Sequence, residues 1–384
     1  MAPRRVLHIV NWYPNQVNKN AAVWIREQIR ALDRYSPSDV VHIEVKPGKK
    51  WRKLRPLEDD VLSYAYEVPF RQWFLIELMT AFLLFYVLFI KKRSSNYSII
   101  DLHIAYPLCT YLHLFRRAIK VPLVISEHWS AYHFNFYVAD TEKLYRIKRI
   151  FRKNKIPVIT VSRSLKNDIE RFSGVELRGY VLPNVVSMDG ALPEGHLSPP
   201  YRFMMLGAWK APKKPLLAIR AFLEAFKGRS DVEMCIGGHD RLAERIKQEV
   251  EEHEGDPPLF FLGKLDKQEV EAEMKKTHAF VHCSEHETFS VVCAEALSNG
   301  VPVLASDKGG IGEFVTPEVG ILVPRNEEGT WCNAFMDFEA RFLRGEGIDR
   351  KKIAKAYRDR FGPQRVGREY AELLEKEVER QAGH

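Results

Sequence analysis

The sequence has few cysteines, and none of them is spaced like a metal ligand. Its 384 residues include five, at positions 109, 235, 283, 293 and 332. An odd, scattered set without paired spacing excludes a disulfide scaffold and a zinc site, and is typical of a protein of the reducing cytosol. Internal repeats and low-complexity tracts are also absent, which excludes solenoid and disordered classes.

Secretory and membrane-spanning signals are equally scarce. Apolar residues 5–10 follow the N-terminus almost at once, so we expect no signal peptide and a cytoplasmic protein. The single long apolar run, residues 73–90, reaches the lower length limit for a membrane span. Glu77 interrupts it and strand patterns continue on both sides, so we expect no span. Two interpretations stay open: a helix buried against a sheet, or one lying at the inner face of the cytoplasmic membrane.

What is present indicates a two-domain globular protein with a basic surface. The chain is 46% hydrophobic and 28% charged, with 58 Lys and Arg against 50 Asp and Glu, a net charge of +8. Residues 46–55 form a strongly basic segment that we interpret as a loop. This balance permits an anionic partner such as a nucleoside diphosphate, a phospholipid surface or a nucleic acid. Nucleic acid ranks last, because aromatic residues do not alternate with a basic stripe.

The most informative stretch runs from residue 279 to residue 313. The apolar run 279–283 predicts a buried parallel strand, and polar residues 284–288 a loop. Residues 290–298 predict a short helix, because Asn299-Gly300 and Pro302 follow as helix-ending residues. Residues 301–305 predict the next strand, and Gly309-Gly310 a turn.

This geometry indicates what the unit could bind. The helix N-terminus opens at the carboxyl end of a parallel strand, where its N–H groups favour an anion such as a diphosphate. Glu287 lies at the mouth of the helix. Glu295 follows Thr288 by seven residues, almost two turns, so we place it about 10 Å further along the same face. A carboxylate there can accept two hydrogen bonds from a ribose. The alternative is that both glutamates are solvated surface charges.

These residues resemble the nucleotide-sugar site of the retaining GT-B glycosyltransferases of family 4. The similarity rests on Glu287-x7-Glu295, the following Ala-Leu-Ser-Asn-Gly-Val-Pro-Val, and Gly309-Gly310-x-x-Glu313. It implies an α/β fold of two Rossmann-like domains facing across a cleft. The expected parts are an acceptor domain over residues 1–190, a nucleotide-sugar domain over 200–360, and a C-terminal helix over 361–384 that packs back on the first domain.

The resemblance also implies roles for residues of the second domain. Glu295 would hold the donor ribose, and Glu287 would contact the donor sugar. Lys213 matches the family lysine that grips the diphosphate, whereas Ala208 stands where the family has an arginine, so Lys210 is the nearby cation that could compensate. The remaining donor contacts would be backbone N–H groups of Phe289, Ser290 and Val291, and the segment beside the base that ends in Gly263 and Lys264.

In the first domain, His128 follows the strand predicted over residues 121–126. A histidine at a strand end faces the crevice rather than the core, although many such histidines are structural. The resemblance gives His128 a catalytic role beside the donor sugar and the acceptor. Glu127, Tyr132 and His133 are the candidate acceptor contacts.

The sequence therefore predicts a retaining glycosyltransferase that moves a sugar from a nucleoside diphosphate sugar to a glycan or lipid-linked acceptor, in cell-surface polysaccharide or glycoconjugate synthesis. The donor is a substrate, so we expect no cofactor, and no acidic cluster with ligand spacing indicates a metal. A nucleotide-sugar epimerase or a glycan phosphorylase could share the architecture. A non-catalytic nucleotide-binding scaffold is a third alternative, suggested by Ala208.

Overall fold

The structure, a computed structural model, describes residues 5–92, 94–188, 190, 198–210, 212–239, 242–253, 255, 257–344 and 348–382. The chain divides into two compact units, of which the first is Met1–Val185 with Pro363–His384 and the second is Val186–Gly362. The predicted boundaries at 190, 200 and 361 therefore move to 185/186 and 362/363. Most of the expected linker, residues 188–200, lies outside the described residues.

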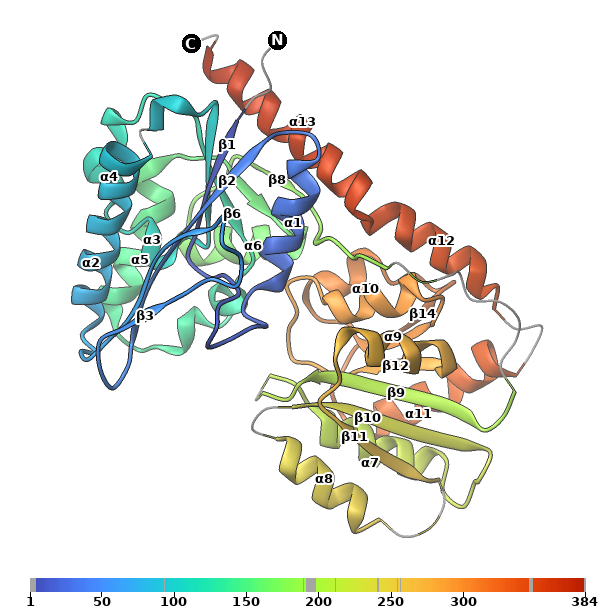
Figure 1. The fold of residues 1–384 in the computed structure, drawn as a ribbon. Coiled ribbons are helices and arrows are strands. Elements are labelled where there is room, and N and C mark those ends of the chain that lie inside the picture. Colours follow the sequence, from blue (N-terminus) through green and yellow to red (C-terminus); the bar gives the residue numbers. More distant parts are fainter. Residues whose placement is uncertain are drawn as a thin grey trace. The chain divides into compact units, whose positions relative to one another are not determined.

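The first unit is built on an eight-stranded sheet with the order β3-β4-β2-β1-β5-β6-β7-β8 (Figure 1). All its pairings are parallel except that of β3 with β4. The apolar runs that predict buried parallel strands form its centre, where β1, β5 and β6 are buried along their whole length. The strands are β1 Val6–Val10, β2 Ser38–Pro47, β3 Arg52–Leu54, β4 Leu62–Val68, β5 Ile99–His103, β6 Leu123–Glu127, β7 Val158–Thr160 and β8 Gly179–Val181.

Helices cover this sheet, and the longer ones carry the expected end signals. Asp140 caps α5 and Ser162 caps α6 through their side chains, and α6 ends at Gly174 in the left-handed conformation. The basic segment 46–55 is not wholly a loop, because it contains the edge strand β3. The helices are α1 Val23–Asp33, α2 Trp73–Tyr86 with a π-helical turn Val87–Lys91, α3 Ala105–Leu108, α4 Leu112–Phe115, α5 Thr141–Asn154, α6 Arg163–Ser173 and α13 Pro363–Ala382.

The second unit has a six-stranded parallel sheet with the order β11-β10-β9-β12-β13-β14. Its core joins the sheet to aromatic side chains of α7 and α11, among them Phe203, Phe222 and Phe335. The strands are β9 Tyr201–Ala208, β10 Val232–His239, β11 Leu259–Gly263, β12 Ala279–His282, β13 Val303–Ser306 and β14 Gly320–Val323. The helices are α7 Pro215–Ala225, α8 Ala243–Glu251, α9 Lys267–Lys276, α10 Val291–Ser298, α11 Glu328–Phe338 and α12 Arg350–Phe361.

The C-terminal helix α13 belongs to the first unit, as expected, although it follows the second along the chain. It packs against α1, and Val366, Tyr370 and Leu374 join the core around Leu32. The approach is close at Gly367, where an added Cβ atom would lie 2.1 Å from the Ala31 carbonyl oxygen. Only glycine fits there.

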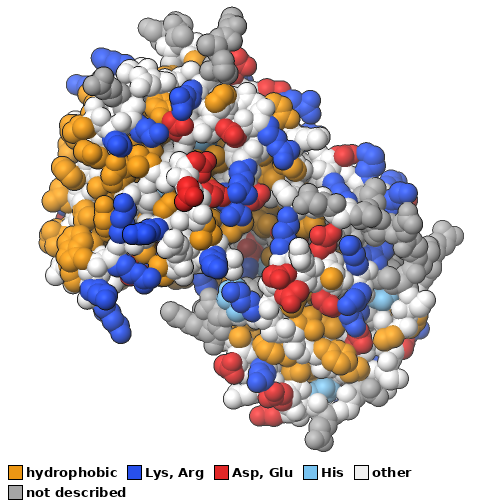
Figure 2. Space-filling model, in the orientation of Figure 1, with side chains coloured by type: hydrophobic (Ala, Val, Ile, Leu, Met, Phe, Trp, Pro, Cys, Tyr) orange, Lys and Arg blue, Asp and Glu red, His pale blue; other side chains and the backbone are white. Residues whose placement is uncertain are grey.

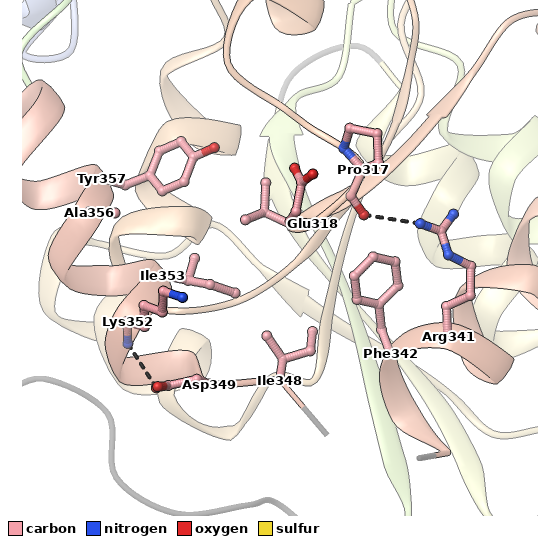
Figure 3. Close-up of a pocket in the computed structure, with 11 residues that line it drawn as sticks. Pro317, Glu318, Arg341, Phe342, Ile348, Asp349, Lys352, Ile353, Ala356 and Tyr357 are labelled. Carbon is pink, nitrogen blue, oxygen red and sulfur yellow. Dashed lines mark hydrogen bonds between the residues drawn. The ribbon is translucent and has the colours of Figure 1, made fainter. Parts of the chain in front are cut away.

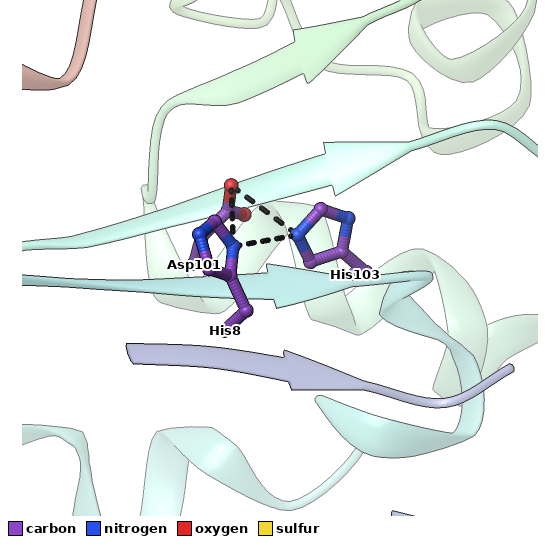
Figure 4. A group of neighbouring side chains, drawn as sticks. All are labelled: His8, Asp101 and His103. Atoms are coloured by element: carbon purple, nitrogen blue, oxygen red, sulfur yellow. Dashed lines mark hydrogen bonds and ion pairs between the residues drawn. The ribbon is translucent and has the colours of Figure 1, made fainter. Parts of the chain in front are cut away.

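A buried polar cluster connects α13 to the centre of the first sheet. His8 of β1 and the pair Asp101 and His103 of β5 lie side by side (Figure 4), with His8 Nδ1 3.0 Å from His103 Nε2. The hydroxyls of Ser126 (2.9 Å) and Tyr370 both donate to Asp101 Oδ2. Burial lowers the pKa of each histidine to about 3 and raises that of Asp101. The cluster is therefore a network of neutral imidazoles around a doubly hydrogen-bonded carboxyl group.

Candidate functional site

The site forms where the strand order of the second unit reverses. β9 lies between β10 and β12, so successive crossovers leave it in opposite directions. In open parallel sheets, ligands bind beside the carboxyl ends of the strands at such a switch point. The segment after β9 carries Lys210 and Lys213, and the segment after β12 carries Glu287 and the start of α10.

Backbone hydrogen bonds join these two segments. Lys213 and Ser284 form an isolated antiparallel bridge. The Lys214 N–H donates to the Cys283 carbonyl at 3.0 Å, and the Glu285 N–H donates to the Pro212 carbonyl at 2.8 Å. The loop that carries Lys213 is therefore held against the loop that leads to Glu287.

Lys213, His282 and Glu287 meet in a compact charged cluster. The Lys213 ammonium contacts Glu287 Oε1, and His282 Nε2 lies 2.9 Å from the same oxygen. Burial opposes the charged form of Glu287, but the Lys213 ammonium and His282 outweigh it and hold the pKa of Glu287 well below its ordinary value. Burial and the Lys213 charge lower the pKa of His282. Glu287 is thus an ionised acceptor that can bind hydroxyl groups.

The expected glycine turn touches this cluster. The Gly310 N–H donates to the Glu287 carbonyl at 2.8 Å. Gly309 has φ +73°, and a Cβ atom there would lie 1.9 Å from the Glu287 carbonyl oxygen. Because a side chain would collide with this backbone, glycine at 309 fixes the position of Glu287.

A second polar network holds the loop that leads to Glu287, and the sequence did not indicate it. Ser306 Oγ accepts from the Ser284 N–H at 3.0 Å and donates to Asn326 Oδ1 at 2.7 Å. Asn326 Nδ2 then donates to the Ser284 carbonyl at 2.9 Å. The three residues follow or end three neighbouring strands, so only the sheet order brings them together. His282 was also missed, although it stands at a strand end like His128.

The N-terminus of α10 is left open. The helix begins at Val291, and Ser290 before it has φ 71° and ψ 79° and provides no side-chain cap. The first N–H groups of the helix therefore point outward without intrahelical partners, as an anion site requires. The Phe289 side chain packs against Phe314 and Phe361 at 5.1 and 5.2 Å between ring centroids. Phe289 can thus offer a ligand only its backbone.

Glu295 lies one turn into α10, which corrects the expected distance. Since Thr288 and Phe289 precede the helix, Glu295 is about 6 Å along the axis from Val291, rather than about 10 Å from the mouth. Its carboxylate is half-buried and makes no hydrogen bond or ion pair with another described residue. Burial raises the pKa of Glu295 to about 7, although the charge of Lys267 opposes this. A buried hydrogen-bond acceptor normally has a partner. Because the Glu295 carboxylate has none among the described residues, it is suited to accept hydrogen bonds from a ligand.

The other predicted donor residues lie around this centre without joining the cluster. Lys210 is exposed in the segment between β9 and Lys213. Gly263 ends β11 with φ +67°, and a Cβ atom there would meet open space. Lys264 after it is exposed. Their contacts with a donor remain predictions.

In the first unit, His128 follows β6 and is buried at 7% exposure. Its ring stacks on that of His103, with centroids 6.0 Å apart and planes 14° apart. Burial lowers the pKa of His128 to about 3, and the neighbouring His103 adds to the shift. The imidazole is therefore neutral, and the side chain of Asn184 beside it opposes the shift.

Two predicted acceptor contacts are wrong. The Glu127 carboxylate is fully buried and accepts hydrogen bonds from the N–H groups of Ala105, His128 and Trp129 at 2.9–3.1 Å. The Tyr132 hydroxyl donates to the same carboxylate at 2.7 Å, so both side chains are occupied inside the protein. They shape the turn that carries His128. His133 is less buried, and its Nδ1 lies 3.1 Å from an Asp168 oxygen.

A cavity of about 480 Å³ lies elsewhere in the second unit (Figure 3). Pro317, Glu318 and Val319 line it just before β14 begins, together with Arg341 and residues of α12 such as Tyr357. It therefore opens at the amino end of β14, whereas Lys213 and Glu287 follow the carboxyl ends of β9 and β12. The cavity is separate from the candidate site.

Comparisons with known proteins find a matching family for much of the second unit. Residues 194–357 match the family described as glycosyl transferases group 1. A GDP-mannose-dependent alpha-mannosyltransferase of Mycobacterium tuberculosis is 40% identical over 72 residues, 18% of this chain and 19% of that protein. The chain spans less than two thirds of the length of the curated relatives it matches, from 19% to 63%.

Solved structures share the fold over almost the whole chain. Sucrose-phosphate synthase from Thermosynechococcus elongatus has a TM-score of 0.71 at 16% identity, covering 97% of this chain and 99% of that one. HepE from Anabaena, in complex with UDP and glucose, has a TM-score of 0.67 at 15% identity, covering 97% and 100%. The similarity extends through both units.

Proposed function

We propose that this protein is a glycosyltransferase, because residues 194–357 match the glycosyl transferases group 1 family and the chain has the GT-B fold. It uses a nucleoside diphosphate hexose as donor and transfers the hexose, with retention of anomeric configuration, to a hydroxyl of a glycan or lipid-linked acceptor. The observation that carries the proposal is the placement of an uncapped helix N-terminus, an ionised Glu287 and an unpartnered Glu295 at one strand switch point.

Each part of the donor has a matching group. The N–H groups at Ser290 and Val291 fit the diphosphate, since they face outward at the positive end of α10. The Glu295 carboxylate fits vicinal ribose hydroxyls, because it is partly desolvated and makes no hydrogen bond or ion pair with another described residue. Glu287, held ionised by Lys213, fits hexose hydroxyls. The relatives named above support either a guanosine or a uridine nucleotide.

The same groups would promote transfer. The bond between the anomeric carbon and the diphosphate oxygen breaks, and its electron pair leaves with the nucleoside diphosphate. Positive charge from Lys213 and the α10 N-terminus stabilises the developing negative charge on that leaving group. The acceptor hydroxyl forms the new bond to the anomeric carbon and gives its proton to the departing diphosphate oxygen. The neutral imidazole of His128 can donate through one ring nitrogen and accept through the other, so it is suited to orient sugar hydroxyls.

Thermal stabilisation by nucleotide sugars tests donor binding. The protein is heated with a panel that includes GDP-mannose and UDP-glucose, and a donor at about 100 times its Kd should add about 2.7 kcal/mol to the stability. Glu295→Ala should abolish most of this shift. Glu328→Ala, which removes an exposed carboxylate on α11 outside the proposed contacts, is the matched control and should keep it.

Turnover separates the proposal from a non-catalytic scaffold. Release of nucleoside diphosphate in the presence of an acceptor hydroxyl is expected in the wild type. If the protein binds the donor without consuming it, the protein is a non-catalytic scaffold. If the product is an epimerised nucleotide sugar, the protein is an epimerase and not a transferase. No stabilisation by any member of the panel would remove the donor site itself.

A further inference from the structure

The helix α2 is apolar on both of its faces, and its polar residues do not lie on the solvent side as they do in most helices of soluble domains. Its polar residues Glu77 and Thr80 face the protein and are fully buried. The Glu77 carboxylate lies 3.5 Å from Arg146 Nη1, and the Arg146 guanidinium also lies over the Trp73 ring at 5.1 Å. The Thr80 hydroxyl donates to the Ile76 carbonyl at 2.7 Å. The face that normally carries the apolar residues therefore carries the only acidic residue of the helix.

The outer face of α2 also carries large apolar side chains. Phe74, Leu78, Phe82 and Phe85 are spaced at four, four and three residues, which places them on one side of the helix. They are 46%, 58%, 65% and 42% exposed, and Ile90 continues the line at 60%. From Phe74 to Ile90 this stripe is about 24 Å long. Figure 2 shows hydrophobic side chains gathered over the face that α2 and α4 occupy in Figure 1.

A neighbouring helix widens the stripe. Leu114 of α4 is 71% exposed, the most exposed of the large apolar residues described. Phe115 next to it packs against Phe85 and Phe89, with ring centroids 5.8 and 6.1 Å apart. The apolar surface is therefore continuous across two elements. Large continuous apolar surfaces on soluble proteins mark contacts with a protein or a membrane.

Basic side chains border this surface. At the start of α2, the Phe70 ring contacts that of Trp51, 59% exposed, at 6.0 Å, which brings the basic segment around β3 beside the helix. The exposed basic residues that form no ion pair with another described residue are Lys49, Lys50, Lys53 and Arg55 there, Arg71 before α2, Lys91 at its far end, and Arg117 after α4. In Figure 2, Lys and Arg side chains lie along the lower border of the hydrophobic area.

We propose that α2 docks this protein on an anionic lipid bilayer. The helix Trp73–Lys91 is long and apolar enough to cross a membrane. Its polar side is held to the unit through Glu77 and Arg146, so it lies along the bilayer surface, with the stripe in the boundary between headgroups and acyl chains. The unpaired basic residues contact lipid phosphates. A second copy of this basic surface would repel the first, whereas an anionic bilayer complements it.

Vesicle flotation with the full chain tests this proposal, which does not depend on the proposed function. The protein should float with vesicles of phosphatidylcholine and phosphatidylglycerol in equal parts, and much less with phosphatidylcholine alone. The double substitution Leu78→Ser and Phe82→Ser should reduce the bound fraction at least tenfold. Because both side chains are exposed, the variant should keep the melting temperature of the wild type. Met336→Ser, which removes a 45% exposed side chain on α11, is the matched control and should bind fully.

The charge requirement is tested separately. Replacing Lys49, Lys50 and Lys53 by Gln should weaken binding to the anionic vesicles about fivefold for each removed charge that contacts lipid. Equal flotation of the wild type and the Leu78→Ser, Phe82→Ser variant would overturn the proposal. A second combination of results would also overturn it. In that case the wild type sediments as a dimer without lipid, the Leu78→Ser, Phe82→Ser variant sediments as a monomer, and the wild type does not bind vesicles.

Discussion

Glu295→Gln should make the ligand-free protein more stable at neutral pH while removing donor binding. The physical reason is that the Glu295 carboxylate is desolvated on α10 without a partner, so folding raises its pKa from 4.5 to about 7. A group whose pKa is raised by folding favours the folded state below its unfolded pKa, and this contribution disappears as the pH rises through the folded value. Glutamine keeps the shape and removes the charge.

The size of the effect follows from the pKa change. A rise from 4.5 to about 7 corresponds to about 3.4 kcal/mol. Glu295 is only half-buried, so solvent screening reduces this to about 1–2 kcal/mol. The difference between variant and wild type should be small near pH 5 and complete near pH 8. For a unit of this size it corresponds to a gain of about 2–8 °C in melting temperature.

Thermal unfolding of both proteins across this pH range is the assay, and Glu287→Gln is the matched comparison. Lys213 and His282 lower the pKa of Glu287, so its charge stabilises the fold above its unfolded pKa, and this contribution is lost as the pH falls through the folded value. Glu287→Gln should therefore destabilise the protein by about 2–3 kcal/mol near pH 8, since Lys213 loses its partner. A pH-independent effect of Glu295→Gln, or one of the same sign as Glu287→Gln, would refute the reasoning.

Three further predictions address the rest of the molecule. His128→Ala should leave donor-induced thermal stabilisation unchanged and reduce turnover by about 10²–10⁴-fold; turnover near that of the wild type would contradict its role. Gly309→Ala should destabilise the protein by about 1–3 kcal/mol and weaken donor stabilisation, because its Cβ atom would displace the Glu287 backbone. Gly329→Ala, where a Cβ atom meets open space, should do neither. Tyr370→Phe should cost about 1–3 kcal/mol in urea unfolding and leave donor affinity unaltered, since it removes one donor to the buried Asp101; an unchanged unfolding midpoint would show that this hydrogen bond does not hold α13.

Most of the fold could be predicted from local patterns, because buried parallel strands are short apolar runs. The strands at the centre of both sheets, such as β1, β6 and β12, coincide with such runs within one or two residues. The edge strand β3 was not predicted. It has only three residues, two of them basic, and such a short segment shows no apolar run. The apolar run of α2 left two interpretations open, a buried helix and a helix at the membrane surface, because composition alone does not say which solvent a helix meets.

Some residues of the candidate site could likewise be grouped from the sequence, and others could not. Glu287, Glu295 and Gly309 lie within one continuous segment, so spacing sufficed to group them. The partners of Ser284 come from Ser306 and Asn326, which only the sheet order makes neighbours. Glu127 was misjudged for a related reason. The Ala105 N–H that donates to its carboxylate comes from a segment 22 residues earlier, and a sequence does not show such burial.

The packing of α13 on α1 has a consequence for biosynthesis. The core of the first unit contains Val366, Tyr370 and Leu374, which the ribosome adds only after the whole second unit. At ordinary elongation rates the first sheet must wait on the order of ten seconds or more for its missing helix. During that interval the surface around Leu32 and the Asp101 carboxyl group are uncovered. The nascent first unit is therefore a natural client for a chaperone, and its folding is completed last although its synthesis begins first.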